Sequence, residues 1–164
     1  MRTVAVRFKR CLPGAAGNGG WTLVELLLVM AIVGILSSLA MLKMQDMVER
    51  ARVAKAIGDI EAIQVEIAGF EAGDDSLPSS LAGIGRAAYL DPWGNPYVYV
   101  KFDPTKGIAG QARKDRFLVP LNSTYDLYSM GKDGQSQSAL TAKASLDDVI
   151  RANDGGFIGL AAHY

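Results

Sequence analysis

The sequence predicts an α+β protein, in which a long N-terminal helix packs on a small antiparallel sheet that carries a C-terminal loop region. Residues 21–77 contain no proline and change from an apolar run to an amphipathic pattern, which favours one helix of about 50 residues. Residues 91–160 instead hold short alternating segments separated by turn residues, which is typical of strands. With 164 residues, 49% of them apolar, the chain fits one domain with an appendage and is not disordered.

Charge is divided unevenly along the chain. Of the 17 basic and 17 acidic residues, four basic ones and no acidic one lie in residues 1–20, so the remainder carries an excess of four acids. The formal net charge of zero argues against a nucleic-acid-binding protein, which needs a basic surface. The basic positions are Arg2, Arg7, Lys9 and Arg10.

Catalytic signatures are missing from the sequence. The only cysteine is Cys11, which excludes an intramolecular disulfide framework and a metal site with several cysteines. The only histidine is His163, the penultimate residue, which argues against catalysis by histidine. No GxSxG, P-loop or HExxH motif occurs. We therefore do not expect an enzyme.

The apolar run, residues 21–42, contains Glu25 as its only charged residue. As a helix it would extend about 33 Å, enough to cross the hydrocarbon core of a membrane. A buried helix of a soluble domain is the alternative. Because basic flanks stay in the cytoplasm, residues 1–20 should lie inside and the rest of the chain outside.

Small residues precede this run instead of following it. A secretory signal peptide has its cleavage site after the apolar segment, whereas here Gly19 and Gly20 stand before it. Cleavage after Gly20 would leave the apolar run at the N-terminus of the mature protein. The order of parts therefore predicts a leader (1–20), a membrane or fibre-core helix (21–42) and a domain (43–164).

The second half of the helix, about residues 43–71, has apolar residues at spacings of three and four. Such spacing predicts one buried stripe against the domain. Gly73 and Pro78 end the helix. The predicted stripe consists of Met47, Ala51, Ala54, Ile57, Ile60, Ile63, Ile67 and Phe70.

The rest of the chain predicts about three short strands, at residues 97–100, 117–121 and 125–130. Residues 145–151 look like a helical turn with Ser145 as its N-cap, and residues 157–160 form a short apolar segment. The turn 91–97 reads DPWGNPY, and we expect Trp93 and Tyr97 to pack on the helix and serve structure.

The N-terminal segments resemble the type IV pilin superfamily: a basic leader ends in Gly20, and WTLVE (21–25) opens an apolar helix. The resemblance implies that a prepilin peptidase cleaves after Gly20 and that Trp21, standing where most members have phenylalanine, becomes N-methylated. It also implies that Glu25 acts in assembly. A carboxylate in an apolar run needs a partner, and the Trp21 amine of a neighbouring subunit could supply one and fix the register. A helix-start acid favoured by the dipole is the alternative.

Farther along, DPWGNPY, then SMGKDG (129–134) and Asp147-Asp148 are similar to the G-type major pseudopilins of type II secretion. This resemblance implies a single-pass inner-membrane protein with its domain in the periplasm. It would polymerise into a pseudopilus that helps to export folded proteins, and bind minor pseudopilins and the inner-membrane assembly platform.

The same resemblance implies a calcium ion. Its ligands would be the carboxylates of Asp133, Asp147 and Asp148 and the carbonyls of Met130 and Ser145. Calcium prefers several carboxylate and carbonyl oxygens, and could hold a loop that lacks a disulfide. From the residues alone, ordinary turn and N-cap aspartates are the alternative.

Two other functions remain open at this point. A surface type IV pilin would have the same N-terminal half, although most such pilins carry a C-terminal disulfide loop, and here Cys11 is the only cysteine. A membrane-anchored calcium-binding or enzymatic domain that never polymerises is the other.

Overall fold

The computed structural model describes residues 20–164 and divides into two compact units, Met1–Leu42 and Lys43–Tyr164. Residues 1–19, which hold Cys11 and almost all of the predicted leader, lie outside the described residues. Helix α1 runs from Leu23 to Asp74, 52 residues. Thr22 caps it, because its hydroxyl accepts a hydrogen bond from the Glu25 amide at 3.2 Å.

In the first unit, the side chains of α1 are exposed from Leu23 to Met41. Among the residues that the structure describes, α1 contains the one segment that is long and apolar enough to cross a membrane, and none of that segment is buried. The first half of the helix therefore buries nothing within its own chain.

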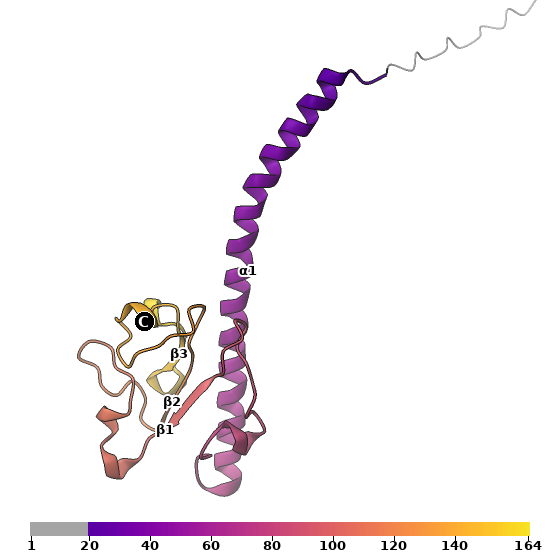
Figure 1. Cartoon of the computed structure of the whole chain (residues 1–164). Helices are drawn as coiled ribbons and strands as arrows, with labels where there is room; N and C mark the ends of the chain where they lie inside the picture. The colour runs from indigo at the N-terminus through magenta and orange to yellow at the C-terminus, as the bar shows by residue number, and fades with distance from the viewer. Residues whose placement is uncertain (1–19) are drawn as a thin grey trace, which may run out of the picture. The chain divides into compact units, whose positions relative to one another are not determined.

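The second unit contains a four-stranded antiparallel sheet in the order β1-β2-β3-β4 (Figure 1). The strands are β1 (Val98–Lys101), β2 (Tyr125–Ser129), β3 (Val149–Ala152) and β4 (Phe157–Leu160). Short 3₁₀ turns lie between the main elements, at Leu81–Ile84, Pro104–Lys106, Ile108–Gly110, Lys143–Ser145, Asn153–Gly155 and Ala161–His163. The α+β fold with a long helix on a small antiparallel sheet is confirmed.

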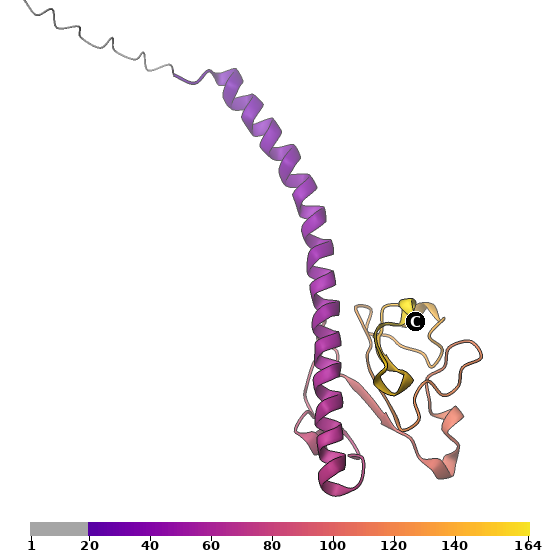
Figure 2. The same cartoon turned by 180° about the vertical axis from the view of Figure 1, so that it is seen from behind.

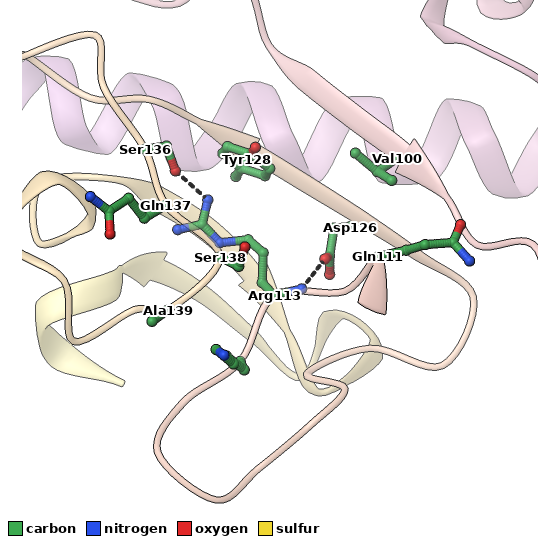
Figure 3. Close-up of a pocket in the computed structure, with 10 residues that line it drawn as sticks. Val100, Gln111, Arg113, Asp126, Tyr128, Ser136, Gln137, Ser138 and Ala139 are labelled. Atoms are coloured by element: carbon green, nitrogen blue, oxygen red, sulfur yellow. Dashed lines mark hydrogen bonds between the residues drawn. The ribbon is translucent and has the colours of Figure 1, made fainter. Parts of the chain in front are cut away.

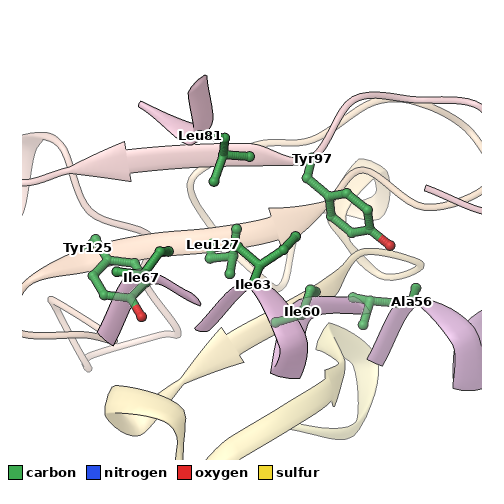
Figure 4. Packing of buried hydrophobic residues seen from close by; sticks show 9 residues of the cluster. Ala56, Ile60, Ile63, Ile67, Leu81, Tyr97, Tyr125 and Leu127 are labelled. Carbon is green, nitrogen blue, oxygen red and sulfur yellow. The ribbon is translucent and has the colours of Figure 1, made fainter. Parts of the chain in front are cut away.

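The main core forms where the second half of α1 meets one face of this sheet (Figure 4). Ile60 and Ile63 are fully buried, and Leu127 of β2 is 1% exposed. Burying such a side chain contributes about 1.5–3 kcal/mol. The cluster consists of Ala56, Ile60, Ile63, Ile67, Leu81, Tyr97, Tyr125, Leu127 and Val149.

The predicted stripe is correct at its C-terminal end and wrong at its N-terminal end. Ile60, Ile63 and Ile67 are buried, whereas Met47, Ala51 and Ala54 are exposed. Ala56 takes the buried place, and two residues turn a helix by about 200°, so Ala54 and Ala56 face nearly opposite sides. Two apolar rows meet near Ile60, and spacing alone could not tell which row faces the domain.

Two strand predictions also need correction. Residues 117–121 form no strand, because Asp115 and Leu118 bond to each other through their backbones and close a tight turn. Residues 149–152 form β3 instead of a helical turn, because Val149 packs on α1 while Ile150 points to the opposite face. With β4 at residues 157–160, the sheet has four strands instead of three.

The face of the sheet turned away from α1 carries a second, smaller core of Leu121, Leu140, Ile150, Ala152 and Ala161. The loops that join β1 to β2 and β2 to β3 supply two of these residues, Leu121 and Leu140. Figures 1 and 2 show α1 on one side of the sheet and the β1–β2 loop on the other. The unit is therefore layered as helix, sheet and loops.

Candidate functional site

The predicted processing segment lies just before α1. Gly20 and Trp21 are not helical, and Trp21 is 68% exposed. Glu25 is also exposed, in the first turn of α1, where the helix dipole favours an acidic side chain. Thr22 caps the helix two residues after Gly20, and α1 begins at Leu23; the sequence analysis did not assign this role to Thr22.

The DPWGNPY turn is held by Asp91, which is buried. Its carboxylate accepts hydrogen bonds from the Trp93 amide (3.0 Å), the Asn95 amide (2.8 Å) and the Ser129 hydroxyl. Such carboxylate-to-amide bonds fix a turn whose backbone amides would otherwise be unpaired. The turn therefore carries Trp93 and Asn95 at fixed positions.

Trp93 and Tyr97 pack on α1, as predicted. The Trp93 indole donates to Glu49 at 2.9 Å, and the Tyr97 hydroxyl donates to Asp59 at 2.9 Å. Burial raises the pKa of Tyr97, and its bond to Asp59 adds to the shift. These contacts support the structural interpretation of the DPWGNPY turn.

The DPWGNPY turn, which was predicted to be structural, contacts the two segments that hold the predicted calcium ligands. The Asn95 amide donates to the Gly131 carbonyl at 2.8 Å, and the Asp133 amide donates to the Asp147 carboxylate at 3.0 Å. Gly131 has φ +65°, and a Cβ on it would overlap the carbonyl of Asp147. Glycine is required there by the conformation and by this close approach.

The acidic residues of this region differ in their surroundings. Asp133 is exposed, and its carboxylate accepts from the Gln135 amide at 2.8 Å. Asp147 is half-buried and Asp148 is completely buried. Among residues 20–164, no group of three histidine, cysteine or acidic side chains is close enough to hold a metal ion by itself.

Asp148 pairs with Arg113, whose side chain is 5% exposed. One carboxylate oxygen, Oδ2, accepts from the guanidinium and from the Ser136 hydroxyl, while Oδ1 is buried without a hydrogen-bond partner. Burial raises the pKa of Asp148; Ser136 and Arg113 offset part of this, and the nearby charge of Asp147 adds to it. Nε of Arg113 is likewise buried without a hydrogen-bond partner, so each member of this ion pair has one unpaired polar atom.

Arg113 also lines a polar pocket of about 490 Å³ (Figure 3). Its backbone amide donates to Asp126 at 2.6 Å, its guanidinium bonds to Ser136 at 2.8 Å, and it lies over the ring of Tyr128. Burial raises the pKa of Asp126, and the Asn122 side chain offsets part of the shift. Sequence reasoning missed Arg113 and Asp126, since nothing in the sequence distinguishes a buried charge from an exposed one.

Comparison with known proteins finds relatives that match most of the chain. The chain is 30% identical over 139 residues to the type II secretion system core protein G of Pseudomonas aeruginosa, covering 72% of this chain and 86% of the relative. It is 26% identical to the protein of the same name from Escherichia coli, over 71% of this chain and 83% of the relative.

A shorter match is to a fimbrial protein of Pseudomonas aeruginosa. It is 40% identical, but over 45 residues, which are 27% of this chain and 29% of the relative. No family model and no solved structure matches significantly. Since a relative 30% identical is matched over most of its length, the chain belongs to the family of the type II secretion system core protein G.

Proposed function

We propose that this chain is the structural subunit of a type II secretion pseudopilus, a periplasmic filament that helps to export folded proteins. The match to core protein G over 72% of the chain is the observation that carries this proposal. The exposed apolar half of α1 supports it, because the side chains from Leu23 to Met41 are all exposed and none of the apolar segment is buried. In this function the protein is a structural subunit and not an enzyme.

Maturation would begin with a prepilin peptidase cutting after Gly20, followed by N-methylation of Trp21. Both residues precede α1 and are exposed, and a peptidase needs an accessible, non-helical bond. Before cutting, the chain would cross the inner membrane once, with residues 1–20 in the cytoplasm and the Lys43–Tyr164 unit in the periplasm.

In the filament, apolar helices of neighbouring copies would pack together in a head-to-tail contact that does not close. Glu25 would then pair with the Trp21 amino group of the next copy. A carboxylate in an apolar surrounding is costly without such a partner. Minor pseudopilins and the inner-membrane assembly platform would be the other partners.

The test replaces Glu25 with alanine and measures membrane insertion and filament yield in sheared cells that express the prepilin peptidase. Glu25→Ala should insert and lose its leader but give at least tenfold less filament. Ser37→Ala, an exposed polar change in the same apolar half, is the matched control and should assemble normally. Intact mass would report the cut after Gly20. A retained leader, or a normal yield from Glu25→Ala, contradicts the proposal.

A calcium ion is the second part of the proposal. The Asp133 amide donates to the Asp147 carboxylate, and Oδ1 of the neighbouring Asp148 is buried without a hydrogen-bond partner. Because the carboxylates do not form a metal site by themselves, a calcium ion here would also need backbone carbonyl ligands. The carbonyls of Met130 and Ser145 would complete the ligands. When bound, the ion would supply no reaction and would only hold the loops together.

Calcium binding can be measured by thermal unfolding of the detergent-solubilised chain, followed by near-ultraviolet circular dichroism. At calcium about 100 times the dissociation constant, linkage predicts about 2.7 kcal/mol, a rise of several degrees in Tm. Asp147→Asn should abolish the rise, and Asp75→Asn, an exposed aspartate after α1, should keep it. An unchanged Tm at millimolar calcium counts against the ion.

A surface type IV pilin is the second candidate, and the match to a fimbrial protein favours it. That match covers 27% of the chain, against 72% for core protein G, so it carries less weight. Deleting the gene separates the two. Loss of protein secretion supports the pseudopilin, and loss of surface filaments with secretion intact supports the pilin.

A further inference from the structure

The two neighbouring aspartates, Asp147 and Asp148, have different partners in the structure. Asp147 is half-buried, and its carboxylate accepts a hydrogen bond from the Asp133 amide at 3.0 Å. Asp148 is completely buried, and its Oδ2 atom accepts from the Arg113 guanidinium and from the Ser136 hydroxyl. The acidic pair is therefore divided between two environments, although the sequence presents it as one motif.

Asp148 already has a positive partner in its own chain. The side chains of Arg113 and Asp148 are 5% and 0% exposed, so salt and solvent screen this ion pair very little. A guanidinium is not deprotonated in proteins, so its charge is always present. A calcium ion bound to Asp148 would lie close to this fixed positive charge and would be repelled by it.

The free oxygen of Asp148 does not by itself indicate a metal ion. Oδ1 of Asp148 and Nε of Arg113 are both buried without a hydrogen-bond partner, and they belong to the two members of one ion pair. One is an acceptor and the other carries an N–H donor. The unused acceptor is therefore matched by an unused donor of its own partner.

Arg113 also fastens the loop that joins β2 to β3. Its guanidinium bonds to Ser136, near the start of this loop, and to Asp148, at its end (Figure 3). At the next residue, the Lys114 carbonyl accepts from the Leu140 amide at 2.9 Å. The β1–β2 loop thus holds the start, the middle and the end of the β2–β3 loop through its own side-chain and backbone groups.

A serine closes the same loop on itself. The Ser145 hydroxyl accepts from the Gln137 amide at 2.9 Å and donates to the Gln137 carbonyl at 3.0 Å, as a hydroxyl can do both at once. The Ser145 carbonyl accepts from the Asp148 amide at 3.3 Å. Hydrogen bonds within the chain therefore fix the segment that carries the predicted calcium ligands Ser145 and Asp147.

We propose that Arg113 is the internal cation of the β2–β3 loop, and that Asp148 is its counter-ion instead of a calcium ligand. The part that concerns calcium rests on the ion proposed above, which Asp133, Asp147 and backbone carbonyls would then hold. Two consequences follow. The loop stays closed without calcium, and the two neighbouring aspartates respond differently to the same substitution.

Calcium titration of two aspartate variants tests the division of the pair. Isothermal titration of the detergent-solubilised chain gives the dissociation constant, at a temperature at which circular dichroism shows each variant to be folded. Asp147→Asn should weaken calcium binding at least about tenfold, because it removes a charged ligand, whereas Asp148→Asn should change it less than about threefold. Asp75→Asn, an exposed change after α1, is the control. Equal weakening by the two variants would make Asp148 a ligand and overturn the assignment.

Thermal unfolding in the presence of EDTA tests the ion pair without calcium. Asp148→Asn leaves the Arg113 guanidinium buried without its anion and should lower the Tm by at least about 5 °C. Asp147→Asn should lower it by less than about 2 °C, because an amide oxygen can still accept from the Asp133 amide. A smaller loss from Asp148→Asn than from Asp147→Asn would contradict the pairing.

A double variant shows whether the two charges act as one unit. Arg113→Met and Asp148→Asn should each destabilise the domain, and the combined variant should lose clearly less than the sum of the two losses, because the second change no longer breaks a pair. Additive losses of Tm in EDTA would show that Arg113 and Asp148 do not depend on each other.

Hydrogen exchange reports whether the loop is closed. In EDTA, the amides of Gln137 and Leu140 should be protected in the unmodified chain, since both are hydrogen-bonded, and calcium should change their rates less than about threefold. Arg113→Met should raise these rates at least about tenfold in EDTA. Lys114→Met, which alters an exposed side chain and keeps the backbone bonds, is the matched control. Protection that appears only with calcium would overturn the proposal.

The outcomes separate this inference from the calcium ion proposed above. If the unmodified chain binds no calcium, that ion is refuted, while the Tm and exchange measurements in EDTA still decide whether Arg113 holds the loop through Asp148. If calcium binds and Asp148→Asn abolishes the binding, the ion stands and the assignment of Asp148 to Arg113 fails.

Discussion

The two halves of α1 are both rich in apolar residues, yet they differ completely in burial. In the first half Ile35 and Leu36 are 62% and 61% exposed, whereas in the second half Ile60 and Ile63 are 0% exposed. The first half is apolar on all sides, with Glu25 as its only charged residue up to Leu42. The second half is amphipathic and has one apolar face. The difference teaches that an apolar sequence alone does not determine burial: the second half packs on the sheet of its own unit, and the first half leaves its apolar side chains exposed.

Polar side chains follow the same division. In the second half of α1, Glu49, Asp59 and Glu66 each bond to a residue of the domain, through Trp93, Tyr97 and Arg86 respectively. The first half has one acidic side chain, Glu25, and it is exposed. Internal pairing of charge is thus a property of the Lys43–Tyr164 unit.

The largest expected effect comes from breaking that internal pairing at Arg113. Arg113→Ala leaves the Asp148 carboxylate buried without its guanidinium, and removing one partner of a buried pair costs about 3–5 kcal/mol. Urea unfolding of the detergent-solubilised chain should show this loss. Lys114→Ala, at the neighbouring exposed position, is the control. A loss below 1 kcal/mol would show that Asp148 does not depend on Arg113.

Equal truncations in the two halves of α1 test the comparison directly. Ile63→Ala should lower the free energy of unfolding of the domain by about 3 kcal/mol, because it leaves a cavity in the core. Ile35→Ala should leave that free energy within about 0.5 kcal/mol, since Ile35 is exposed. Both are measured by urea unfolding in detergent. Equal losses would show that the first half also packs within its own chain.

The smallest expected effect concerns the Arg86–Glu66 ion pair on the surface of the domain. The hydrogen bond from Arg86 lowers the pKa of Glu66, so the pair stabilises the fold above the ordinary glutamate pKa of about 4.3 and loses this effect as the pH falls through the lowered value. Screening limits the effect to less than about 1 kcal/mol.

This pH dependence is measured by comparing the unfolding free energies of Glu66→Gln and the unmodified chain at pH 7 and pH 3. The difference between the two proteins should shrink at the lower pH, because protonation of Glu66 removes the charge that glutamine lacks. Glu61→Gln, an exposed change on the same helix, serves as the control. A difference that grows toward acid pH would contradict the direction of the shift.

Much of the fold could be predicted because it depends on local patterns. The helix from residue 21 onward, its end near Gly73, and strands near Tyr97 and Tyr125 follow from spacing and turn residues. The rest depended on tertiary contacts. The strand β3 was mistaken for a helical turn because Ser145 and the aspartates before it resemble the start of a helix. The buried row of α1 was ambiguous because two apolar rows of side chains meet at Ile60.

The candidate site divides in the same way. The segments around Asn95, Gly131 and Asp147 could be singled out from the sequence, and the structure places them in contact. Arg113 could not, because an arginine in a loop of polar residues has no pattern that predicts burial. Its pairing with Asp148 depends on how two loops cross the far face of the sheet.

Thr22, which caps α1, lies on the C-terminal side of the proposed cleavage position after Gly20. Among residues 20–164, the helical hydrogen bonds of α1 begin at Thr22, whose carbonyl accepts from the Leu26 amide and whose hydroxyl accepts from the Glu25 amide. The new amino group would appear one residue before the cap, at the positive end of the helix dipole, where a cation is disfavoured. Cleavage would thus create an unfavourably placed positive charge, which pairing with the carboxylate of a neighbouring copy would stabilise.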